Sequence, residues 1–294
     1  MHSPSQSSDI YFILGQTATG KTARAVGLAR ENSGELVNCD SRQIYQGLDI
    51  ITGKTDNPVD IPMHLVDVRE PDVSYSAYDF AKEATQHIQE IISRYKTPII
   101  VGGTGLYARV LLHADPNVQE LIELSPVDSG LNNLTVDELQ QKLITLNSSL
   151  FAKLTPSDKL NPRRLIRAIQ KIEHGHTNLI ALDSPNTIKN QHNVNITILL
   201  HENQEILRSR ISTRVDERLS LGAVDECKAL LAAGYKQTDP GLATLGYQSI
   251  FRYLEGQSSF EAMRSEWITK ECQYAKRQKT YLLKYFEEAH IHSV

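Results

Sequence analysis

The sequence predicts an α/β fold, a parallel sheet with a phosphate-binding loop, interrupted by an inserted helical domain and completed by C-terminal helices. Short apolar runs alternate with helical patterns over residues 10–113, as expected for a parallel sheet. The alternation stops in residues 114–193, where only helical patterns occur, and it returns in residues 194–294. We therefore expect two core segments separated by an insert, preceded by a polar, disordered tail at residues 1–9.

A glycine loop near the start of the chain supports this assignment. It matches the pattern G-x-x-x-x-G-K-[ST] at every specified position and consists of Gly15, Gln16, Thr17, Ala18, Thr19, Gly20, Lys21 and Thr22. An apolar run at residues 10–14 predicts a strand before the loop, and residues 22–30 have helical spacing after it. Backbone N–H groups and a helix N-terminus then surround an anion, as in P-loop NTPase-like folds. Lys21 supplies charge to a phosphate and Thr22 a hydroxyl ligand for Mg²⁺, and these flanks disfavour a chance glycine turn.

Composition limits the possible functions. The formal net charge is -4, so a role in nucleic-acid binding needs local basic faces. The three cysteines, Cys39, Cys227 and Cys272, are widely spaced and typical of reduced thiols in a cytosolic protein. No apolar run is long enough to predict a membrane span.

Residues 35–43 predict a strand that ends in polar residues, among them Asp40. Ligands of open parallel sheets sit beyond the carboxyl ends of the strands, so Asp40 should share a crevice with Lys21. A carboxylate there serves as a metal-shell ligand or a general base. The alternative is a carboxylate that only caps the following turn.

A second glycine turn follows the strand predicted at residues 98–101. Its sequence is Gly-Gly-Thr-Gly-Leu-Tyr over residues 102–107. A typical phosphate-loop ATPase has an Asp after this strand to hold Mg²⁺, whereas this chain has glycines and Thr104, which can donate a hydrogen bond to a phosphate oxygen. The absence of a residue that positions water argues against a motor or switch ATPase.

The remaining predicted elements are defined by capping and turn residues. We expect a strand at residues 63–68, a helix from a capping box at Ser76 and Asp79 to about Tyr95, and a strand at residues 194–200. We also expect a capping box at Thr135 and Glu138, a helix start at Asn161 and Pro162, a turn at residues 245–248, and a final helix capped by Ser258 with Glu261.

Two predicted helices carry basic faces. Residues 159–173 hold five cationic side chains against Glu173 alone, and the polar side comprises Arg163, Arg164, Arg167 and Lys171. The final helix also has five, namely Lys270, Lys276, Arg277, Lys279 and Lys284, against Glu271. Such faces are often only solvated, but because residues 159–173 lie in an insert of a phosphate-binding domain, their basic face becomes a candidate for RNA contact. Arg210, Arg214 and Arg218, four apart, predict a single basic row. We expect Tyr274, Tyr281 and Tyr285 to pack rather than to stack on bases.

Together these residues resemble the tRNA dimethylallyltransferase (tRNA isopentenyltransferase) family, over residues 10–286. The similarity rests on the glycine loop, on Asp40 with Ser41, and on Gly103 with Thr104, in this order along the chain. Further matches are Tyr45, Gly47, Asp49, residues 64–67, Tyr75 with Ser76, Arg164 with Arg167, Arg210 with Arg214, Gly246 with Tyr247, and residues 275–278. No paired Cys/His zinc finger follows the final helix, so the bacterial-type architecture is the more similar one.

The resemblance implies transfer of a dimethylallyl group from dimethylallyl diphosphate to N6 of adenosine 37 in the tRNA anticodon stem-loop, with Mg²⁺ as cofactor. It implies Asp40 as general base, Thr104 as donor to the bridging oxygen of the diphosphate, and Arg214 as stabiliser of the leaving charge. It further implies a cytoplasmic protein, expected to be a monomer. The tRNA contacts that it implies are Asp40, Ser41, Arg42, Gln43, Thr104, Gln119, Arg163, Arg164, Arg167, Gly246, Tyr247, Gln248, Lys276, Arg277 and Gln278.

The chain departs from the family pattern mainly at tRNA contacts. Gln119 and Gln248 are uncharged where cations are common, and the segment after Tyr107 is short. From the residues alone, two other functions stay open. One is a phosphate-loop kinase for a nucleotide or small alcohol, with Asp40 as base and Asp67 near Mg²⁺. The other is an RNA-binding module without turnover.

Overall fold

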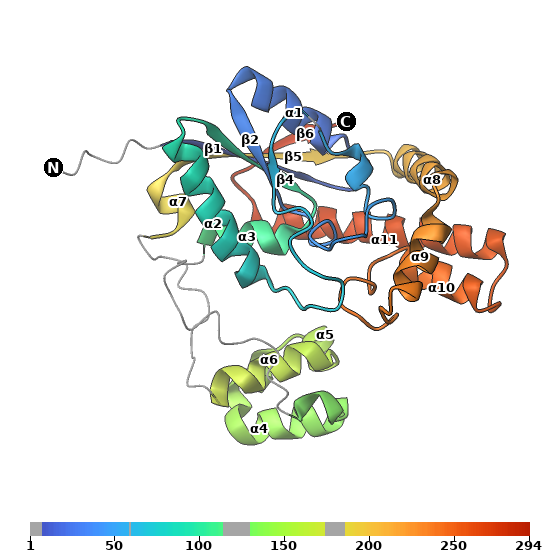
Figure 1. The fold of residues 1–294 in the computed structure, drawn as a ribbon. Helices are drawn as coiled ribbons and strands as arrows, with labels where there is room; N and C mark the ends of the chain where they lie inside the picture. The colour runs from blue at the N-terminus through green and yellow to red at the C-terminus, as the bar shows by residue number, and fades with distance from the viewer. Residues whose placement is uncertain (1–7, 59, 114–129, 174–185) are drawn as a thin grey trace. The chain divides into compact units, whose positions relative to one another are not determined.

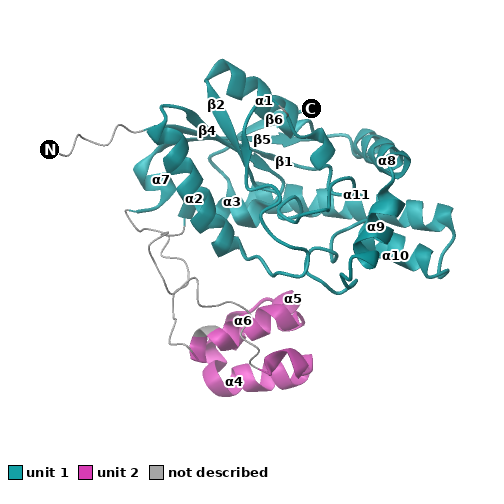
Figure 2. Ribbon diagram, viewed as in Figure 1, with its two compact units in different colours: residues 1–114, 185–294 teal, residues 115–184 magenta. Residues whose placement is uncertain are grey.

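The computed structural model describes residues 8–58, 60–113, 130–173 and 186–294 (Figure 1). The chain forms two compact units, one of residues 1–114 and 185–294 and the other of residues 115–184 (Figure 2). The helix α7, Ile188–Gln191, packs on α3 and β5 of the larger unit. The helical insert therefore ends earlier than residue 193, where the helical pattern of the sequence stops.

The larger unit is built on one parallel sheet of six strands in the order β3-β2-β4-β1-β5-β6. The strands are β1 Asp9–Gly15, β2 Gly34–Asn38, β3 Met63–His64, β4 Thr97–Gly102, β5 Asn193–Leu200 and β6 His290–Ser293. The central strands are apolar because helices cover both of their faces. The predicted strand at residues 63–68 was too long. Leu65 and Asp67 have φ values of 61° and 56°, in the left-handed region, and this backbone ends β3 at His64.

Helices lie on both faces of this sheet. Figure 1 shows α1, Lys21–Glu31, above the sheet, and α2, Ala77–Ser93, α3, Gly105–His113, and α11, Phe260–Tyr285, below it. The other helices of this unit are α8 Gln204–Ser220, α9 Ala223–Ala232, α10 Tyr247–Leu254 and the short 3₁₀ helix η1 Lys54–Asp56. An apolar cluster that joins α8, α9, α10 and α11 includes Trp267, which is fully buried. The predicted α/β fold class is confirmed.

Helix starts mostly agree with the sequence. The predicted capping box of Ser76 and Asp79 begins α2. The prediction for α11 was wrong by one residue, because Ser259, rather than Ser258, accepts the N–H of Ala262. The turn expected at residues 245–248 is instead the start of α10, with Gly246 as its N-cap in a left-handed φ of 93°.

The smaller unit contains η3 Leu131–Asn133, α4 Val136–Lys153, α5 Pro156–Lys159 and α6 Pro162–Glu173. The predicted capping box at Thr135 and Glu138 begins α4, and the side chain of Asn161 caps α6 by accepting the N–H of Arg164. Leucine and isoleucine side chains of α4 and α6 form a separate apolar core. The unit therefore has a core of its own, as expected for an inserted domain.

A buried carboxylate ties three segments of the larger unit together. Glu35 on β2 has a side chain only 5% exposed, and it contacts His64 and Arg94 at 2.7 Å each and Lys96 at 3.0 Å. Burial opposes ionisation of Glu35. The hydrogen bonds from His64, Lys96 and Arg94 outweigh burial and lower its pKa from 4.5 to about 2. The charge thus joins β2 to β3 and to the chain between α2 and β4.

Replacing Glu35 by Gln should lower the free energy of unfolding at neutral pH by about 3 kcal/mol, since it removes the anion of a buried ion network. The pKa is lower in the folded state, so ionised Glu35 stabilises the fold above pH 4.5, and this contribution is lost as the pH falls from 4.5 towards 2. The variant should therefore lose stability less steeply over this window. Urea unfolding followed by circular dichroism at several pH values measures both effects.

The matched control is Asp60→Asn, which removes an exposed ion pair with Arg30. Exposed ion pairs contribute little to stability, so this variant should be nearly as stable as the wild type. Equal losses for the two variants would contradict the role given to Glu35.

Candidate active site

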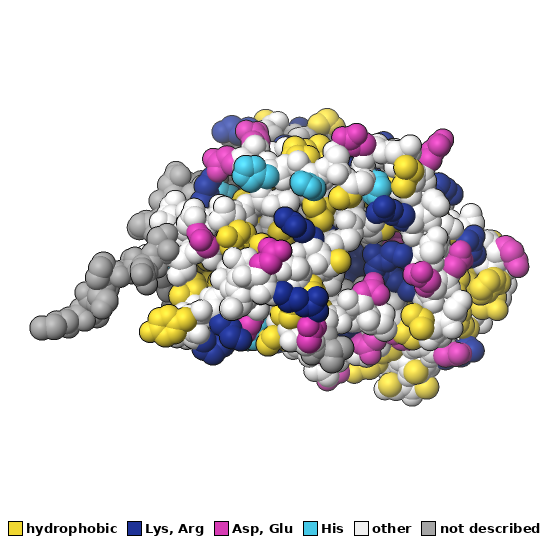
Figure 3. Space-filling model, turned by 90° about the horizontal axis from the view of Figure 1, so that it is seen from above, with side chains coloured by type: hydrophobic (Ala, Val, Ile, Leu, Met, Phe, Trp, Pro, Cys, Tyr) yellow, Lys and Arg dark blue, Asp and Glu magenta, His cyan; other side chains and the backbone are white. Residues whose placement is uncertain are grey.

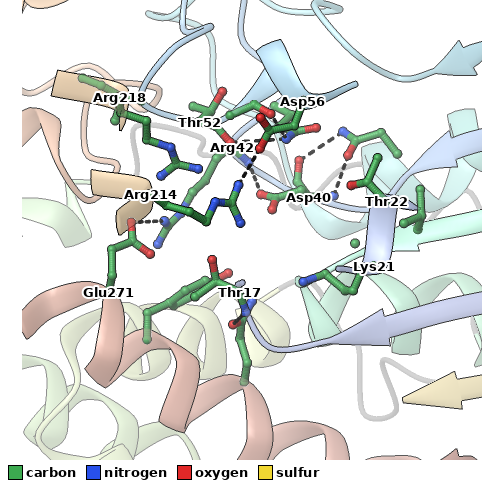
Figure 4. Close-up of a pocket in the computed structure, with 18 of the residues that line it drawn as sticks. Thr17, Lys21, Thr22, Asp40, Arg42, Thr52, Asp56, Arg214, Arg218 and Glu271 are labelled. Carbon is green, nitrogen blue, oxygen red and sulfur yellow. Dashed lines mark hydrogen bonds and ion pairs between the residues drawn. The ribbon is translucent and has the colours of Figure 1, made fainter. Parts of the chain in front are cut away.

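The phosphate loop connects β1 to α1, as predicted, and it lines a polar pocket at the carboxyl ends of the strands (Figure 4). Thr17, Lys21 and Thr22 contribute to this pocket. The ammonium group of Lys21 donates to the carbonyl oxygen of Gln16 in the same loop. Burial lowers the pKa of Lys21 to about 8, which nearby Asp40 opposes and Arg214 reinforces. Lys21 is therefore a desolvated cation that an incoming anion can engage.

Asp40 lies in the same pocket as Lys21, as the parallel-sheet rule predicts. One of its carboxylate oxygens accepts the N–H of Arg42 at 3.0 Å, so the proposed turn-capping role is real. Within the described residues no side chain forms a hydrogen bond or an ion pair with its other carboxylate oxygen. Asp40 thus caps a turn and keeps one oxygen for a ligand.

Thr104 is held close to Asp40 by hydrogen bonds with the next residue, Ser41. Its hydroxyl oxygen accepts the N–H of Ser41 at 3.0 Å and lies 3.2 Å from the hydroxyl of Ser41. A Cβ on Gly102 would stand 2.1 Å from the carbonyl oxygen of Cys39, so only glycine lets β4 end this close to β2. The glycine turn therefore allows a close approach between two backbone segments, as predicted.

Arginine side chains from α8 form the opposite wall of the pocket. Figure 4 shows Arg214 and Arg218 extending towards Asp40 from the side facing Lys21. Arg214 forms an ion pair with Asp56 at 2.7 Å. The three arginines of the predicted row all lie on α8, but Arg210 is exposed and does not line this pocket, so only Arg214 and Arg218 reach it.

Sequence reasoning missed Glu271 and Tyr274 as residues that line the pocket. The guanidinium group of Arg42 stacks 4.1 Å from the ring centroid of Tyr274 and lies 3.5 Å from Glu271. Tyr274 packs, as expected, but it also lines the pocket. The available signal was its position one helical turn before Gln278, which faces the same pocket.

Gln278 joins α11 to the phosphate loop. Its side-chain oxygen accepts the N–H of Thr17 at 2.8 Å, and its nitrogen donates to the carbonyl oxygen of Gly103 at 3.0 Å. Gln16 reaches back, donating to Ala275 at 3.1 Å and accepting the N–H of His201 at 2.9 Å. Gln278 is 5% exposed, so its role in this structure is to hold the two glycine turns rather than to contact RNA.

Two other residues predicted to contact tRNA, Tyr247 and Gln248, lie at the start of α10. Tyr247 is fully buried and its hydroxyl donates to Glu226, so it offers no surface to a base in this structure. Gln248 donates to the carbonyl oxygens of Gln237 and Leu242, at 2.8 and 3.0 Å, at the start of α10 behind Gly246. These residues serve the fold around α10, which corrects the expectation of direct RNA contact for Tyr247.

The remaining predicted contacts are divided among three places. Gln43 lines the pocket, and its amide nitrogen lies 3.3 Å from the carbonyl oxygen of Thr52. Lys276 and Arg277 are exposed on α11. On α6, Arg163 is exposed, Arg164 pairs with Asp158, and Arg167 contacts Gln170. Gln119 and the side chain of Lys171 lie outside the described residues.

The described residues hold no cluster of three or more His, Cys, Asp or Glu side chains suited to a metal ion. The pocket does offer the Thr22 hydroxyl and oxygen ligands of Asp40. This donor set fits a hard cation such as Mg²⁺ only if a bound phosphate completes its coordination, which is usual for Mg²⁺ at phosphate loops. In the described part of the chain, no helix is long and apolar enough to cross a membrane.

Comparison with known proteins agrees with this geometry. A family model described as IPP transferase matches residues 43–285, and one described as isopentenyl transferase matches residues 8–59. The chain belongs to the IPP transferase family. It is 35% identical over 285 residues to tRNA dimethylallyltransferase 2 of Geotalea uraniireducens (strain Rf4), covering 95% of this chain and 90% of that protein.

Solved structures give the same result. The full-length tRNA isopentenylpyrophosphate transferase from Bacillus halodurans has a TM-score of 0.66 and 30% identity, covering 98% of this chain and 90% of that one. A eukaryotic dimethylallyltransferase acting on tRNA has a TM-score of 0.79 at 23% identity, covering 98% of this chain and 74% of that one, which supports the fold alone. The kinase alternative loses its metal ligand as well, because Asp67 pairs with Lys54 and does not line the pocket.

The pKa of Lys21 leads to a prediction about anion binding. At pH 9 most Lys21 side chains in the free protein are neutral, since the pKa is about 8. A bound diphosphate favours the charged ammonium, so binding should take up protons, and affinity for inorganic diphosphate should fall between pH 7 and 9. Isothermal titration calorimetry in buffers of different ionisation enthalpy measures this uptake.

Lys21→Met is the comparison variant. It should bind inorganic diphosphate at least about tenfold more weakly, the cost of one charge-assisted hydrogen bond, and retain only the proton uptake that belongs to diphosphate itself. The same proton uptake in variant and wild type would show that Lys21 does not engage the anion.

Proposed function

We propose that this protein transfers a dimethylallyl group from dimethylallyl diphosphate to N6 of adenosine 37 in the tRNA anticodon loop. One observation carries the proposal. A phosphate loop and a carboxylate with one uncontacted oxygen line the same pocket, in a chain of the IPP transferase family. The loop suits the diphosphate, and the carboxylate suits the proton that leaves the amine.

The reaction needs two kinds of assistance, and the pocket offers both. The exocyclic amine is a weak nucleophile, so as its nitrogen bonds to the allylic carbon a base must accept an N6 proton. Asp40 takes this role through its uncontacted oxygen. The C–O bond of the donor breaks at the same carbon, and the electron pair leaves with the diphosphate. Thr104 donates to the bridging oxygen, while Lys21 and Arg214 stabilise the leaving charge.

A bound Mg²⁺ ion would add positive charge against the diphosphate oxygens. Of this chain's residues, the Thr22 hydroxyl would hold it directly, with the donor supplying phosphate oxygens. Stacking of Arg42 on Tyr274 limits the freedom of both side chains beside Asp40. The target base has to leave the anticodon-loop stack to reach this pocket, as enzymes acting on single bases require.

The tRNA itself needs a basic surface. On the face seen in Figure 3, Lys and Arg side chains alternate with Asp and Glu, so this view shows no extended basic surface. The proposal therefore places the RNA backbone on two separate features, the exposed arginines of α6 and the exposed cations Lys276 and Arg277 of α11. Action as a monomer in the cytoplasm, consistent with three free cysteines, is part of this proposal.

Asp40→Asn should lower the single-turnover rate of prenyl transfer by roughly 10²–10⁴, the usual contribution of a positioned general base. The amide keeps the shape and can still accept the N–H of Arg42, so tRNA affinity should change little. Rapid-quench measurement of N6-prenyladenosine in tRNA, analysed by nucleoside mass spectrometry, gives the rate. Asp225→Asn, an exposed change on α9, should react like the wild type. A near-normal rate for Asp40→Asn would exclude Asp40 as the base.

Salt dependence tests the RNA surfaces. Each phosphate contact releases counterions, so losing one should lower the slope of log K against log salt by just under ~1. Arg163→Ala on α6 and Lys276→Ala on α11 should both weaken tRNA binding and flatten this slope. Lys228→Ala, on α9, is the control and should leave the slope unchanged. Identical slopes in all four proteins would mean that both basic faces are merely solvated.

A further inference from the structure

The walls of the active-site pocket contain one more cation than they have carboxylates to balance. Its described lining includes four cationic side chains, Lys21, Arg42, Arg214 and Arg218, against three carboxylates, Asp40, Asp56 and Glu271. Each carboxylate already has a partner. Asp56 pairs with Arg214, Glu271 contacts Arg42, and the charge of Asp40 favours ionised Lys21. Arg218 is left over.

The guanidinium group of Arg218 has no hydrogen bond or ion pair with any residue that the structure describes. It lies against the backbone at Gly53, where an added Cβ would stand 2.6 Å from one of its nitrogens and 3.2 Å from a nitrogen of Arg214. The two guanidinium groups of α8 are thus neighbours and repel each other. Burial lowers the pKa of Arg218 to about 10. Arg214 adds to this shift, whereas the charges of Glu271 and Asp56 oppose it without outweighing burial. A desolvated cation without a direct partner is costly unless an anion joins it.

We propose that Arg218 is a ligand of the leaving diphosphate, acting beside Arg214 on the side of the pocket opposite Lys21. This inference rests on the proposed use of the phosphate loop for the prenyl donor. The guanidinium group offers several N–H donors in a fixed plane, and this arrangement matches the oxygens of a phosphate group.

The position of Arg218 favours the donor diphosphate over a phosphate of the RNA backbone. Arg218 lines the same pocket as Thr17 and Lys21 of the phosphate loop, and Figure 4 shows it pointing into the space that Asp40 and Arg214 border. A diphosphate has two phosphate groups, and cations on opposite walls can neutralise both. The residue thereby becomes a candidate catalytic residue, because charge on the diphosphate grows as the C–O bond breaks.

Replacing Arg218 should change the stability of the protein in opposite directions, depending on whether the residue serves a ligand or holds the fold. If Arg218 serves a ligand, the unliganded protein holds a desolvated, unpaired charge, so Arg218→Met should be at least as thermostable as the wild type. If Arg218 holds the fold, the same change should lower the melting temperature. Methionine keeps the apolar stem of the side chain and removes only the charged head.

The test compares the wild type with Arg218→Met, Lys21→Met and Arg208→Met, the last an exposed arginine on the same helix. Calorimetry with inorganic diphosphate should give affinities about 10–100-fold weaker for Arg218→Met, the size of a lost charge-assisted hydrogen bond. Diphosphate should also raise its melting temperature less. Inorganic phosphate, which can occupy the loop alone, should bind with nearly unchanged affinity. Arg208→Met should match the wild type throughout.

Each outcome decides something. Unchanged diphosphate affinity in Arg218→Met, with a loss in Lys21→Met, would overturn this inference and leave the proposed function standing. Unchanged diphosphate affinity in both variants would show that the loop does not bind the diphosphate, and it would contradict the proposed function as well. Weaker tRNA binding with unchanged diphosphate binding would instead assign Arg218 to an RNA phosphate and overturn the proposal.

Discussion

Two glutamine side chains join the phosphate loop to the last long helix, and the geometry of the site depends on them. The side chain of Gln278 on α11 accepts a hydrogen bond from the N–H of Thr17 and donates one to the carbonyl oxygen of Gly103. One side chain therefore bridges both glycine turns. Gln16 binds Ala275 of α11 from the loop side. An amide suits this task because it both donates and accepts, and its partners are one backbone N–H and one backbone carbonyl. The loop and the Thr104 turn are therefore fixed relative to each other by a helix distant in sequence.

This arrangement links the two substrates physically. The helix that clamps the loop through Gln278 also presents Lys276 and Arg277 to solvent, two residues and one residue earlier. Tyr274, on the same helix, carries the stacked guanidinium group of Arg42 next to Asp40. A nucleic acid bound along α11 would thus rest on the element that orders the donor site. Binding energy from the large substrate could then position the groups that act on the small one.

The sequence predicted those features that depend on local patterns. The strand, loop and helix around Lys21, the capping boxes and the meeting of Asp40 with the loop follow from spacing and from the geometry of parallel sheets. The sequence-based predictions failed where contacts between distant segments of the chain determine the structure. Tyr247 looked like an exposed aromatic in a turn, but its helix packs beside Trp267 and Tyr247 itself is buried. The short β3 also had no signal, because left-handed backbone at Leu65 and Asp67 is unusual for such residues.

The arginines of α8 show why a spacing of four is an incomplete guide. Steps of four residues exceed one helical turn of 3.6 residues, so each step rotates the side chain by roughly 40° around the helix. Over two steps the row turns from solvent at Arg210 into the pocket at Arg218, with Arg214 between. The net charge of -4 hides this arrangement, since the pocket itself has a cationic excess. An acidic protein can therefore hold a diphosphate firmly, provided that its unmatched positive charges face the ligand and its carboxylates are paired or exposed elsewhere.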